Sequence, residues 1–450
     1  MSAESIDRKE PTSVRTGVVG TGHVGLVTAV ALSSLGHEVV GTDSDDEKIA
    51  RLKDGEVPFF EPGVQELLTQ EMESGRLTFT TSYAEAVPGA EAVLISVGTP
   101  TRASGEANLI AVEHAARDVA RHATGRVVVV EKSTVPTGTA KRLRSTLHRE
   151  RPDLADDLEV ACNPEFLREG RALEDSLRPD RILVGAESET AFATMRRLYK
   201  PLTERGCELI ETDISTAELT KHASNAFLAL KISFANALAR LCERSGADVE
   251  AVTRGMGKDP RIGPDFLRAG LGYGGSCFPK DLAAFERVAS KLGYPFPMLR
   301  EVARINEEAI DAALDKVREA LWNLEGKRIA LFGLAFKPGT DDIRFAPALT
   351  LARRLLAEGA HIVGFDPVAG EAAKAELSDI ELADDVYAAA TGAHCVVLCT
   401  EWPEFSDLDL TKLKEAMAYP VIVDGRNFLS EEAVRTAGFT YYPTGKAPIL

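Results

Sequence analysis

Cys277 lies in the stretch GGSCFPKD, residues 274–281, among glycine, serine, lysine and aspartate rather than in an apolar run. From this stretch alone, four readings are open: a packing residue, a metal ligand, half of a disulfide, or a nucleophile. The last reading is the one with chemistry, because a thiolate adds to the carbonyl carbon of an aldehyde. The rest of the chain has to decide between them.

The other cysteines narrow these alternatives. The six cysteines, at 162, 207, 242, 277, 395 and 399, form no CxxC pair, and no His/Cys cluster has the spacing of a zinc site. We therefore predict no metal, and a reducing compartment disfavours a disulfide framework. Cys395 and Cys399, in AHCVVLCT, are typical of a core strand. We expect most of the cysteines to be small buried hydrophobes, with Cys277 as the exception.

Lys221 and Asn225 form a second candidate pair. They lie in a stretch in which apolar residues recur every three or four positions, which predicts one long helix from about 214 to 245, ended by Gly246. A helix of this length suggests a spine between domains and a dimer surface. Residues four apart share a helix face. A lone lysine on a helix is usually solvated, but a lysine and an asparagine together beside Ala, Phe and Leu favour a site.

A nucleotide site is indicated near the start of the chain. The strand TGVVG runs into a GxGxxG motif, an apolar helix and a second strand that ends at Asp43. This order is the dinucleotide fingerprint in its full context. The glycines permit a tight turn and close approach of a pyrophosphate, while the helix N-terminus stabilises its charge. A carboxylate at position 43 binds a ribose 2′-hydroxyl and repels a 2′-phosphate, so NAD is favoured over NADP.

Polar residues end three further predicted strands, at 92–100, 126–134 and 158–166. Thr99, Thr134 and Glu165 lie at these ends. The carboxyl ends of the strands of an open parallel sheet line the ligand crevice, so these residues are placed for chemistry. Each of them, taken singly, is also compatible with a helix cap.

A second α/β unit is indicated from residue 327. The strand RIALFGL is followed by the loop AFKPGTDD, a helix and the strand HIVGFDP, and later strands are AHCVVLCT and VIVDG. This pattern resembles a nucleotide-binding unit without the GxGxxG motif. Lys337 and Arg344 belong at its crevice and suit phosphate binding. Solvated loop charges are the equal alternative on spacing alone.

Composition sets the outer limits. A chain of 450 residues is too long for one core, and its formal net charge of -17 disfavours nucleic acid and a membrane surface as partners. The N-terminal residues lack the apolar stretch of a signal peptide, no apolar run reaches membrane-spanning length, and we expect a cytoplasmic protein. The predicted fold class is α/β, with two Rossmann-like doubly wound domains joined by a long central helix and a helical middle domain. The predicted boundaries are a flexible tail at 1–14, an NAD-binding domain at 15–211, a central helical or dimerisation domain at 212–325 and a second nucleotide-binding, Rossmann-like domain at 326–450.

A reactive thiol beside an NAD site has a specific chemical meaning. Oxidation of an alcohol to a ketone needs no covalent step. Oxidation of an aldehyde to an acid benefits from one, because the thiolate forms a hemithioacetal that loses hydride to give a hydrolysable thioester.

Long motifs in the chain resemble the UDP-glucose/GDP-mannose dehydrogenase family, from residue 16 to about 430. The motifs are GTGHVGLVTA at 20–29, EPGV at 61–64, STVPTGT at 133–139, NPEFLREG at 163–170, PDRILVG at 179–185, DPRIGPDFLRAGLGYGGSCFPKD at 259–281 and GLAFKPGTDDIR at 333–344. The resemblance implies that C6 of a nucleotide-linked sugar is oxidised twice, from alcohol to carboxylate, with two NAD and one water. PDRILVG and the segment around the cysteine are more similar to the UDP-glucose branch, which implies UDP-glucose as substrate and UDP-glucuronate as product.

The resemblance also implies roles for residues. Cys277 is similar to the nucleophile of the family, and Lys221 with Asn225 to the groups that stabilise the oxyanion. The other catalytic residues implied are Asp281 and Thr134, which hold water and assist proton transfer, and Glu165, a further acid, base or water-orienting group. The cofactor residues implied are Gly20, Gly22, Val24, Gly25, Asp43, Lys48, Thr99, Thr134, Glu169, Lys280 and Arg344. The substrate residues implied are Glu165, Phe166, Leu167, Arg168, Glu169, Lys221, Asn225, Phe266, Leu267, Arg268, Ala269, Gly270, Gly274 and Lys337, with Arg261 donated across a dimer interface.

One departure and two rivals accompany this reading. The family usually has a tyrosine where this chain has His23 in the glycine loop. We expect NAD to bind through the backbone all the same. The same chemistry on GDP-mannose or an N-acetylated UDP-sugar stays open, as does a single-step dehydrogenase of the 3-hydroxyacid or 6-phosphogluconate type, against which the second α/β unit argues. A non-enzymatic NAD-sensing module gives no reason for Lys221, Cys277 and Asp281 to occur together.

Overall fold

The structure is a computed structural model that describes residues 13–100, 102 and 106–450. The predicted tail at 1–14 lies outside the described residues except for Ser13 and Val14. Val14 is fully buried, and its N–H donates a hydrogen bond to His37. No helix in the described part of the chain is long and apolar enough to cross a membrane.

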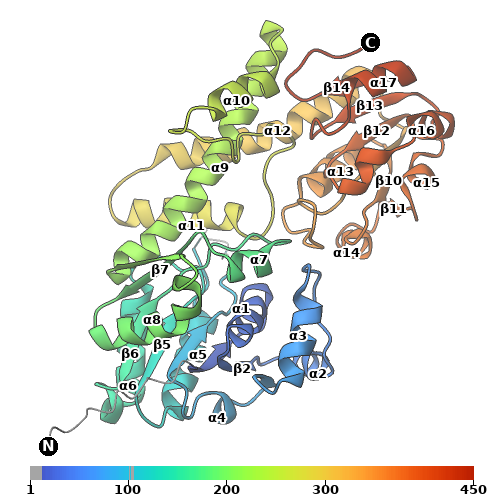
Figure 1. Cartoon of the computed structure of the whole chain (residues 1–450). Coiled ribbons are helices and arrows are strands. Elements are labelled where there is room, and N and C mark those ends of the chain that lie inside the picture. Colours follow the sequence, from blue (N-terminus) through green and yellow to red (C-terminus); the bar gives the residue numbers. More distant parts are fainter. Residues whose placement is uncertain (1–12, 101, 103–105) are drawn as a thin grey trace, which may run out of the picture. The chain divides into compact units, whose positions relative to one another are not determined.

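The described residues form two compact units, one ending at His222 and the other beginning at Ala223. Each unit contains one sheet of its own (Figure 1). Helix α9 (Ile214–Ser245) begins in the first unit and ends in the second, and its bounds match the helix predicted from the apolar periodicity.

The first unit holds an eight-stranded sheet in the order β3-β2-β1-β4-β5-β6-β7-β8. All neighbours are parallel except β6 and β7, which run antiparallel. Its first six strands thus have the order of a dinucleotide-binding sheet, extended at one edge by two strands that the sequence analysis did not anticipate. The strands are β1 (Arg15–Val19), β2 (Glu38–Thr42), β3 (Leu77–Thr80), β4 (Ala92–Ile95), β5 (Val127–Glu131), β6 (Leu158–Cys162), β7 (Arg181–Ala186) and β8 (Glu208–Thr212).

Helices cover both faces of this sheet. They are α1 (His23–Ser34), α2 (Asp46–Lys53), α3 (Val64–Glu73), α4 (Tyr83–Ala86), α5 (Ile110–His122), α6 (Thr139–Glu150), α7 (Ala172–Leu177) and α8 (Glu189–Thr203). Strand β5 shows why the run VVVV has no polar alternation. Val128 and Val130 join the core formed with α1 and α8, whereas Val127 and Val129 join the core formed with α5 and α6. A parallel strand buried on both faces needs apolar residues at every position.

The second unit repeats this plan with six parallel strands in the order β11-β10-β9-β12-β13-β14. They are β9 (Arg328–Phe332), β10 (His361–Phe365), β11 (Glu381–Leu382), β12 (Cys395–Leu398), β13 (Val421–Asp424) and β14 (Thr440–Pro443). The helices of this unit after α9 are α10 (Val249–Gly257), α11 (Phe278–Lys291), α12 (Pro297–Leu321), α13 (Pro347–Ala357), α14 (Gly370–Glu376), α15 (Val386–Ala390), α16 (Leu410–Ala416) and α17 (Glu431–Ala437). Side chains of β9 alternate between a core with α12 and α13 and a core with α15 and α16.

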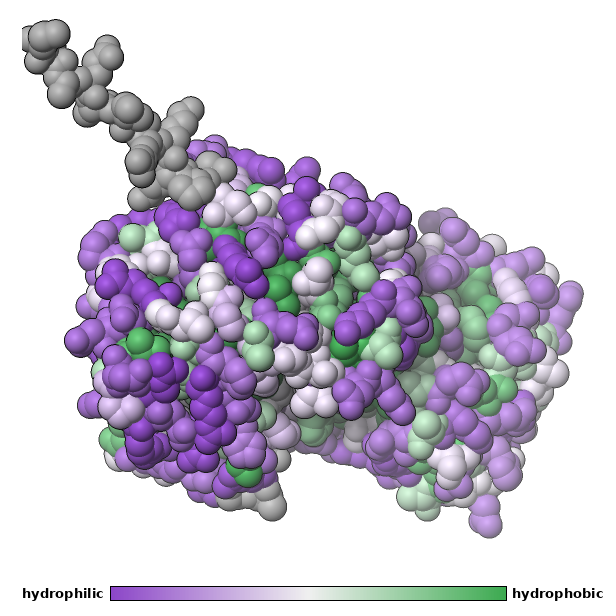
Figure 2. All heavy atoms as spheres, turned by 90° about the horizontal axis from the view of Figure 1, so that it is seen from below, coloured by the Kyte–Doolittle hydropathy of each residue, from purple (hydrophilic) through white to green (hydrophobic). Residues whose placement is uncertain are grey.

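The predicted fold class is therefore confirmed: two doubly wound α/β sheets, a long helix and a helical middle. The domain boundaries stay predictions. The face drawn in Figure 2 is mostly hydrophilic, with apolar residues in small groups between polar ones, as expected for a chain with a net charge of -17.

Asp366, just after β10, organises the loop that follows β9. Its carboxylate accepts hydrogen bonds from the N–H groups of Leu334 and Ala335 at 2.6 and 2.9 Å and from the Trp402 indole at 3.0 Å. Two more N–H groups, from the turn after Asp366 itself, satisfy its other oxygen. Since Asp366 is buried, its removal leaves these donors without an acceptor.

We expect Asp366→Ala to lower the free energy of unfolding of the second unit by about 3 kcal/mol, because several buried donors lose their partner. Urea denaturation followed by tryptophan fluorescence measures this. Trp402 is buried and Trp322 is almost fully exposed, so the blue-shifted emission reports on Trp402. Asp379→Ala, at an exposed position, is the control. Equal unfolding curves for the two variants would contradict the role of Asp366.

Candidate active site

The glycine loop joins β1 to α1, and each of its glycines has a separate reason. Gly20 has a φ of +92°, and a Cβ there would lie 2.6 Å from the carbonyl oxygen of Ser96. A Cβ on Gly25 would lie 1.8 Å from the carbonyl oxygen of Gly20, so only glycine lets the helix approach the strand. Around Gly22 no atom lies within 4 Å of that position, which leaves open space at the start of α1. Val24 follows in the first turn. A dinucleotide pyrophosphate fits this loop.

Asp43 lies at the end of β2, as the fingerprint requires. Its Oδ2 atom accepts a hydrogen bond from the Thr21 N–H at 2.8 Å and lies 2.9 Å from the Lys48 ammonium. Burial alone would raise the pKa of Asp43, but the hydrogen bond from Thr21 and the charge of Lys48 hold it below its ordinary value. The carboxylate is therefore ionised and available to accept from a ribose hydroxyl.

Adjacent strand ends place Thr99 and Thr134 together. The Thr99 hydroxyl donates a hydrogen bond to the carbonyl oxygen of Thr134 at 2.9 Å, across the ends of β4 and β5. Ser133 also ties these segments, because its hydroxyl donates to the carbonyl oxygen of Val97 at 2.8 Å. Two of the predicted cofactor residues are thus fixed against each other.

Lys221 and Glu165 form a buried ion pair of 2.9 Å, with side chains only 5% and 7% exposed. The other oxygen of Glu165 accepts from the Leu167 N–H at 2.6 Å. The Lys221 ammonium also lies 5.4 Å from the centre of the Phe166 ring, and the Arg181 guanidinium lies 3.8 Å from the same centre. Two predicted catalytic groups from distant parts of the chain are thus in direct contact.

Lys132 belongs to the same buried region and was missed by the sequence analysis. Its ammonium donates to Asn163 Oδ1 at 3.0 Å, and Asn163 also accepts from the Tyr199 hydroxyl at 2.5 Å. Burial lowers the pKa of Lys132 to about 8, although the negative charge of Glu165 acts in the opposite direction. The available signal was a charged pair, Glu-Lys, directly after four valines.

Glu131, the other member of that pair, is fully buried at the end of β5. Neither of its carboxyl oxygens has a hydrogen-bond partner among the described residues. Burial, and secondly the negative charge of Glu218, raise the pKa of Glu131 well above its ordinary value and so favour its neutral form. Glu218 itself, on α9, accepts from the N–H groups of Gly138 and Ala140 at 2.5 and 2.9 Å and so holds the start of α6.

The second unit carries the thiol. Cys277 immediately precedes α11 and is partly buried. Asp281 lies one turn later and is almost fully buried. Its two oxygens accept from Asn225 Nδ2 at 2.6 Å and from the Lys280 ammonium at 2.8 Å. Cys277, Asp281, Asn225 and Lys280, all predicted from the sequence, are therefore grouped at one helix end.

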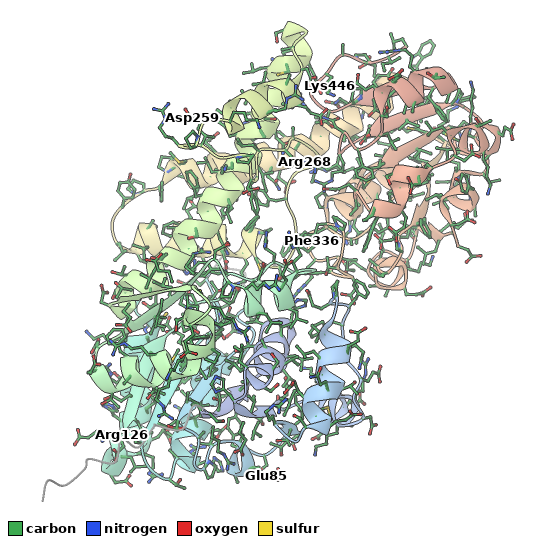
Figure 3. All side chains as sticks on the ribbon, viewed as in Figure 1. Glu85, Arg126, Asp259, Arg268, Phe336 and Lys446 are labelled. Atoms are coloured by element: carbon green, nitrogen blue, oxygen red, sulfur yellow. The ribbon has the colours of Figure 1, made fainter. Side chains whose placement is uncertain are left out.

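Glycines let the loop before Cys277 pack against the loop after β9. A Cβ on Gly274 would lie 2.3 Å from the carbonyl oxygen of Phe345, and one on Gly275 would lie 2.8 Å from the Phe336 ring. The Gly275 N–H donates to the carbonyl oxygen of Arg344 at 2.9 Å. The Lys337 ammonium lies 5.5 Å from the Phe336 ring, a residue marked in Figure 3. Lys337 and Arg344 are thus carried by the loop on which the cysteine segment rests.

Other predicted residues are placed less closely. Arg261 is exposed, and its guanidinium pairs with Asp259, marked in Figure 3, at 2.6 Å. Arg344 pairs in the same way with Asp342 at 2.7 Å. The segment 266–270 contains the half-buried Phe266, whose ring lies 6.2 Å from that of Phe278, and the exposed Arg268. The described residues contain no group of three or more His, Cys, Asp or Glu side chains suited to a metal ion.

Comparisons with known proteins agree along the whole chain. Three models of the UDP-glucose/GDP-mannose dehydrogenase family match: the NAD binding domain at 14–203, the central domain at 215–308 and the UDP binding domain at 330–431. The chain belongs to this family. A protein of Bacillus subtilis named UDP-glucose 6-dehydrogenase TuaD is 41% identical over 97% of this chain and 94% of its own. One of Rhizobium meliloti, named UDP-glucose 6-dehydrogenase, is 43% identical over 95% of this chain and 99% of its own.

Solved structures give the same picture. A UDP-glucose dehydrogenase from Pyrobaculum islandicum has a TM-score of 0.90 and 41% identity, over 97% of this chain and 98% of its own. A UDP-D-ManNAc dehydrogenase from Pyrococcus horikoshii has a TM-score of 0.85 and 29% identity, over 97% of this chain and its full length. The predicted family and the NAD cofactor are confirmed, and the chain is an NAD-dependent dehydrogenase. The roles of single residues stay predictions.

Glu131 generates a testable pH dependence. In the unfolded chain its carboxyl ionises near its ordinary value of 4.5, whereas in the fold its pKa lies well above that value. The stability it contributes is therefore present below about pH 4.5 and is lost as the pH rises toward the raised pKa. Glu131→Gln does not titrate, so we expect its free energy of unfolding, relative to the parent, to increase by up to about 1.4 kcal/mol per pH unit above that value.

Urea denaturation followed by circular dichroism at about pH 5 and about pH 7 measures the difference. Glu73→Gln, at an exposed position on α3, is the control and should run parallel to the parent. A Glu131→Gln variant that also runs parallel would show that the Glu131 carboxyl does not hold its proton in the fold.

Proposed function

We propose that the protein oxidises C6 of UDP-glucose to the carboxylate of UDP-glucuronate, consuming two NAD and one water, through a covalent bond to Cys277. The single observation that carries the proposal is the grouping of Cys277 with buried Asp281, Asn225 and Lys280 at the start of α11, in a chain with a dinucleotide loop. Oxidation of an alcohol to a carbonyl compound does not require a nucleophilic thiol. The relatives named UDP-glucose 6-dehydrogenase, 41% and 43% identical, support UDP-glucose over other sugars.

The first oxidation converts the C6 alcohol to an aldehyde. NAD supplies the hydride acceptor in both oxidations. The proton of the hydroxyl passes to a base, and Lys221 stabilises the developing oxyanion with Asn225. In the structure Lys221 is held by Glu165 at 2.9 Å, so its ammonium is already oriented and desolvated. Glu165, which contacts Lys221, is then the base that accepts the proton of the hydroxyl.

The second oxidation runs through the thiol. The Cys277 thiolate adds to the aldehyde carbon, and the new oxyanion takes a proton to give a hemithioacetal. Loss of hydride from C6 and of the hydroxyl proton gives a thioester, which water then cleaves to the carboxylate and the free thiol. Asp281 and Thr134 hold that water and accept its proton. Asp281 is oriented for this task by the hydrogen bonds that its oxygens accept from Asn225 and Lys280.

The sugar nucleotide is held by the segments predicted for it, 165–169 and 266–270, with Gly274 and Lys337. The ammonium of Lys337 supplies charge for a diphosphate. NAD is held by the glycine loop, Asp43, Lys48, Thr99, Thr134, Glu169, Lys280 and Arg344. We place the reaction in the cytoplasm, where reducing conditions keep the six cysteines out of disulfides.

We further propose a homodimer built on α9. Phe227, Phe234 and Leu241 recur every seven residues along this helix and are 61%, 46% and 60% exposed. Residues at this spacing form one stripe on a helix, and such a stripe of large apolar side chains favours burial against a second copy. Arg261, which is exposed and forms an ion pair with Asp259, would then serve the substrate of the partner.

Stoichiometry is the decisive experiment. Purified protein is incubated with limiting UDP-glucose and excess NAD, and NADH is counted per sugar consumed. We expect two NADH and UDP-glucuronate. One NADH per sugar would mean a single-step dehydrogenase and a structural Cys277. Oxidation of GDP-mannose or an N-acetylated UDP-sugar in place of UDP-glucose would keep the mechanism and change the substrate.

Cys277→Ala should lower the rate of acid formation by at least about 10³-fold, because the thioester cannot form. The rate of UDP-glucuronate formation is measured by chromatography. Cys207→Ala removes another half-exposed thiol and should leave the rate unchanged. Substantial steady-state turnover to the acid in Cys277→Ala would exclude the covalent path.

Phe234→Glu should shift the protein from dimer to monomer by at least about 10-fold in dissociation constant, because a charge then faces the partner surface. Sedimentation velocity over a concentration series measures this shift. Leu292→Glu changes a more exposed apolar residue, in the segment after α11, and should leave the assembly unchanged. A Phe234→Glu dimer as tight as the parent would rule out α9 as the interface.

A further inference from the structure

Glu61 is a buried carboxylate to which the sequence analysis gave no role. It lies in the turn before α3, is 5% exposed as a residue, and its side chain is fully buried. Its Oε2 atom accepts from the Gly170 N–H and its Oε1 atom from the Ala172 N–H, both at 2.7 Å. Gly170 directly follows Glu169, and Ala172 is the first residue of α7. Glu61 therefore fixes the end of the 165–169 segment.

The same carboxylate also reaches the glycine loop. His23 Nε2 lies 2.8 Å from Glu61 Oε2, a close polar contact that does not have the geometry of a hydrogen bond. The imidazole stacks on Phe59 with ring centres 4.5 Å apart and an angle of 26°. Phe59 and Glu61 thus hold the residue that replaces the usual tyrosine of the family between them.

The surrounding helices make this contact stiff. Helix α1 packs against both α3 and α7. Gly63, at the start of α3, has a φ of +78°, and a Cβ there would lie 3.2 Å from Leu173 of α7. A buried carboxylate that already has two backbone donors and one imidazole has little freedom to re-form these contacts elsewhere. A shift of one loop therefore alters the contacts of the other.

We propose that Glu61 is a positioning residue that couples the dinucleotide loop to the 165–170 segment, with His23 as its contact on the cofactor side. Binding of the dinucleotide orders the loop that carries His23, and Glu61 transmits that order to the Gly170 and Ala172 amides. The segment then presents Glu165 and Glu169 to the sugar nucleotide. This last consequence rests on the proposed function, whereas the coupling itself concerns only the NAD site and the segment.

Hydrogen exchange of the full-length protein tests the coupling with cofactor alone. Mass spectrometry compares exchange in peptides covering 163–177, with and without saturating NADH. In the parent, NADH should slow exchange in these peptides by at least about threefold. In His23→Phe, which keeps the stack on Phe59 and both backbone hydrogen bonds of Glu61 but removes the imidazole nitrogen, this protection should fall below half of the parental effect.

Two further variants, compared with His23→Phe, separate coupling from a purely structural role of Glu61. Glu61→Gln should lose the protection and raise exchange without ligand, whereas Glu73→Gln, exposed on α3, should behave as the parent. If Glu61→Gln does not fold, as judged by circular dichroism, His23→Phe decides alone. Equal protection by NADH in His23→Phe and the parent, or none in the parent, would overturn the proposal, since direct cofactor contact or plain helix capping would then be the whole role.

A fluorescence titration of NADH connects the coupling to binding of the sugar nucleotide. NADH cannot be oxidised by the sugar, so its fluorescence gives a dissociation constant with and without UDP-glucose. We expect UDP-glucose to tighten NADH binding by about 5- to 10-fold in the parent and by less than twofold in Glu61→Gln and His23→Phe. Equal tightening in all three would overturn the link to the sugar. Failure of UDP-glucose to bind the parent would instead count against the proposed substrate, and the exchange experiment would still decide the coupling.

Discussion

The predicted catalytic residues of the first unit depend on the buried ion pair between Lys221 and Glu165. Two charges that are 95% and 93% buried lose most of their hydration, and an ion pair alone does not offset that cost. The surrounding structure supplies the rest. The Leu167 N–H satisfies the second oxygen of Glu165, and the Phe166 ring lies beneath the ammonium. Removing either charge leaves the other isolated, so the two are positioned as one element.

The helix that carries Lys221 is also fixed by buried polar contacts. Within the first unit, α9 is tied to the segment after β5 by two contacts of its own. Glu218 holds the start of α6 through two N–H groups, and the His222 ring donates to the carbonyl oxygen of Val135 at 2.7 Å. Thr134 lies in the same segment. The oxyanion group and the water-holding hydroxyl proposed here are thus positioned by one stretch of helix and one loop.

The sequence predicted what depends on local pattern and on long motifs. Periodicity located α9 to the residue, and the glycine loop, Asp43 and the strand ends followed from strand–turn–helix order. Contacts between distant segments were not predictable. Nothing in the sequence pairs Glu61 with Gly170. The Glu-Lys pair after four valines marks Glu131 and Lys132, but it does not by itself show that both side chains are buried. Likewise, no periodicity separates β7 as an antiparallel neighbour of β6, because a strand buried on both faces reads the same in either direction.

The six strands of the second sheet have the same order as the first six strands of the first sheet. In both sheets an aspartate follows the second strand, Asp43 in one and Asp366 in the other, but the two carboxylates have different partners. At Asp43 one oxygen accepts from the Thr21 N–H and lies beside Lys48, and the other accepts from the Asp45 N–H at 3.2 Å. Lys48 is a long side chain that can swing aside for a ribose hydroxyl. At Asp366 both oxygens are bound by backbone N–H groups and by Trp402, and a hydroxyl would have to displace donors that cannot move. Gly22 also leaves space that the first loop needs, whereas Ala335 in the second loop is buried. The second sheet therefore has the topology of a dinucleotide site, but the carboxylate at the end of its second strand holds a loop and is not available to accept from a ribose.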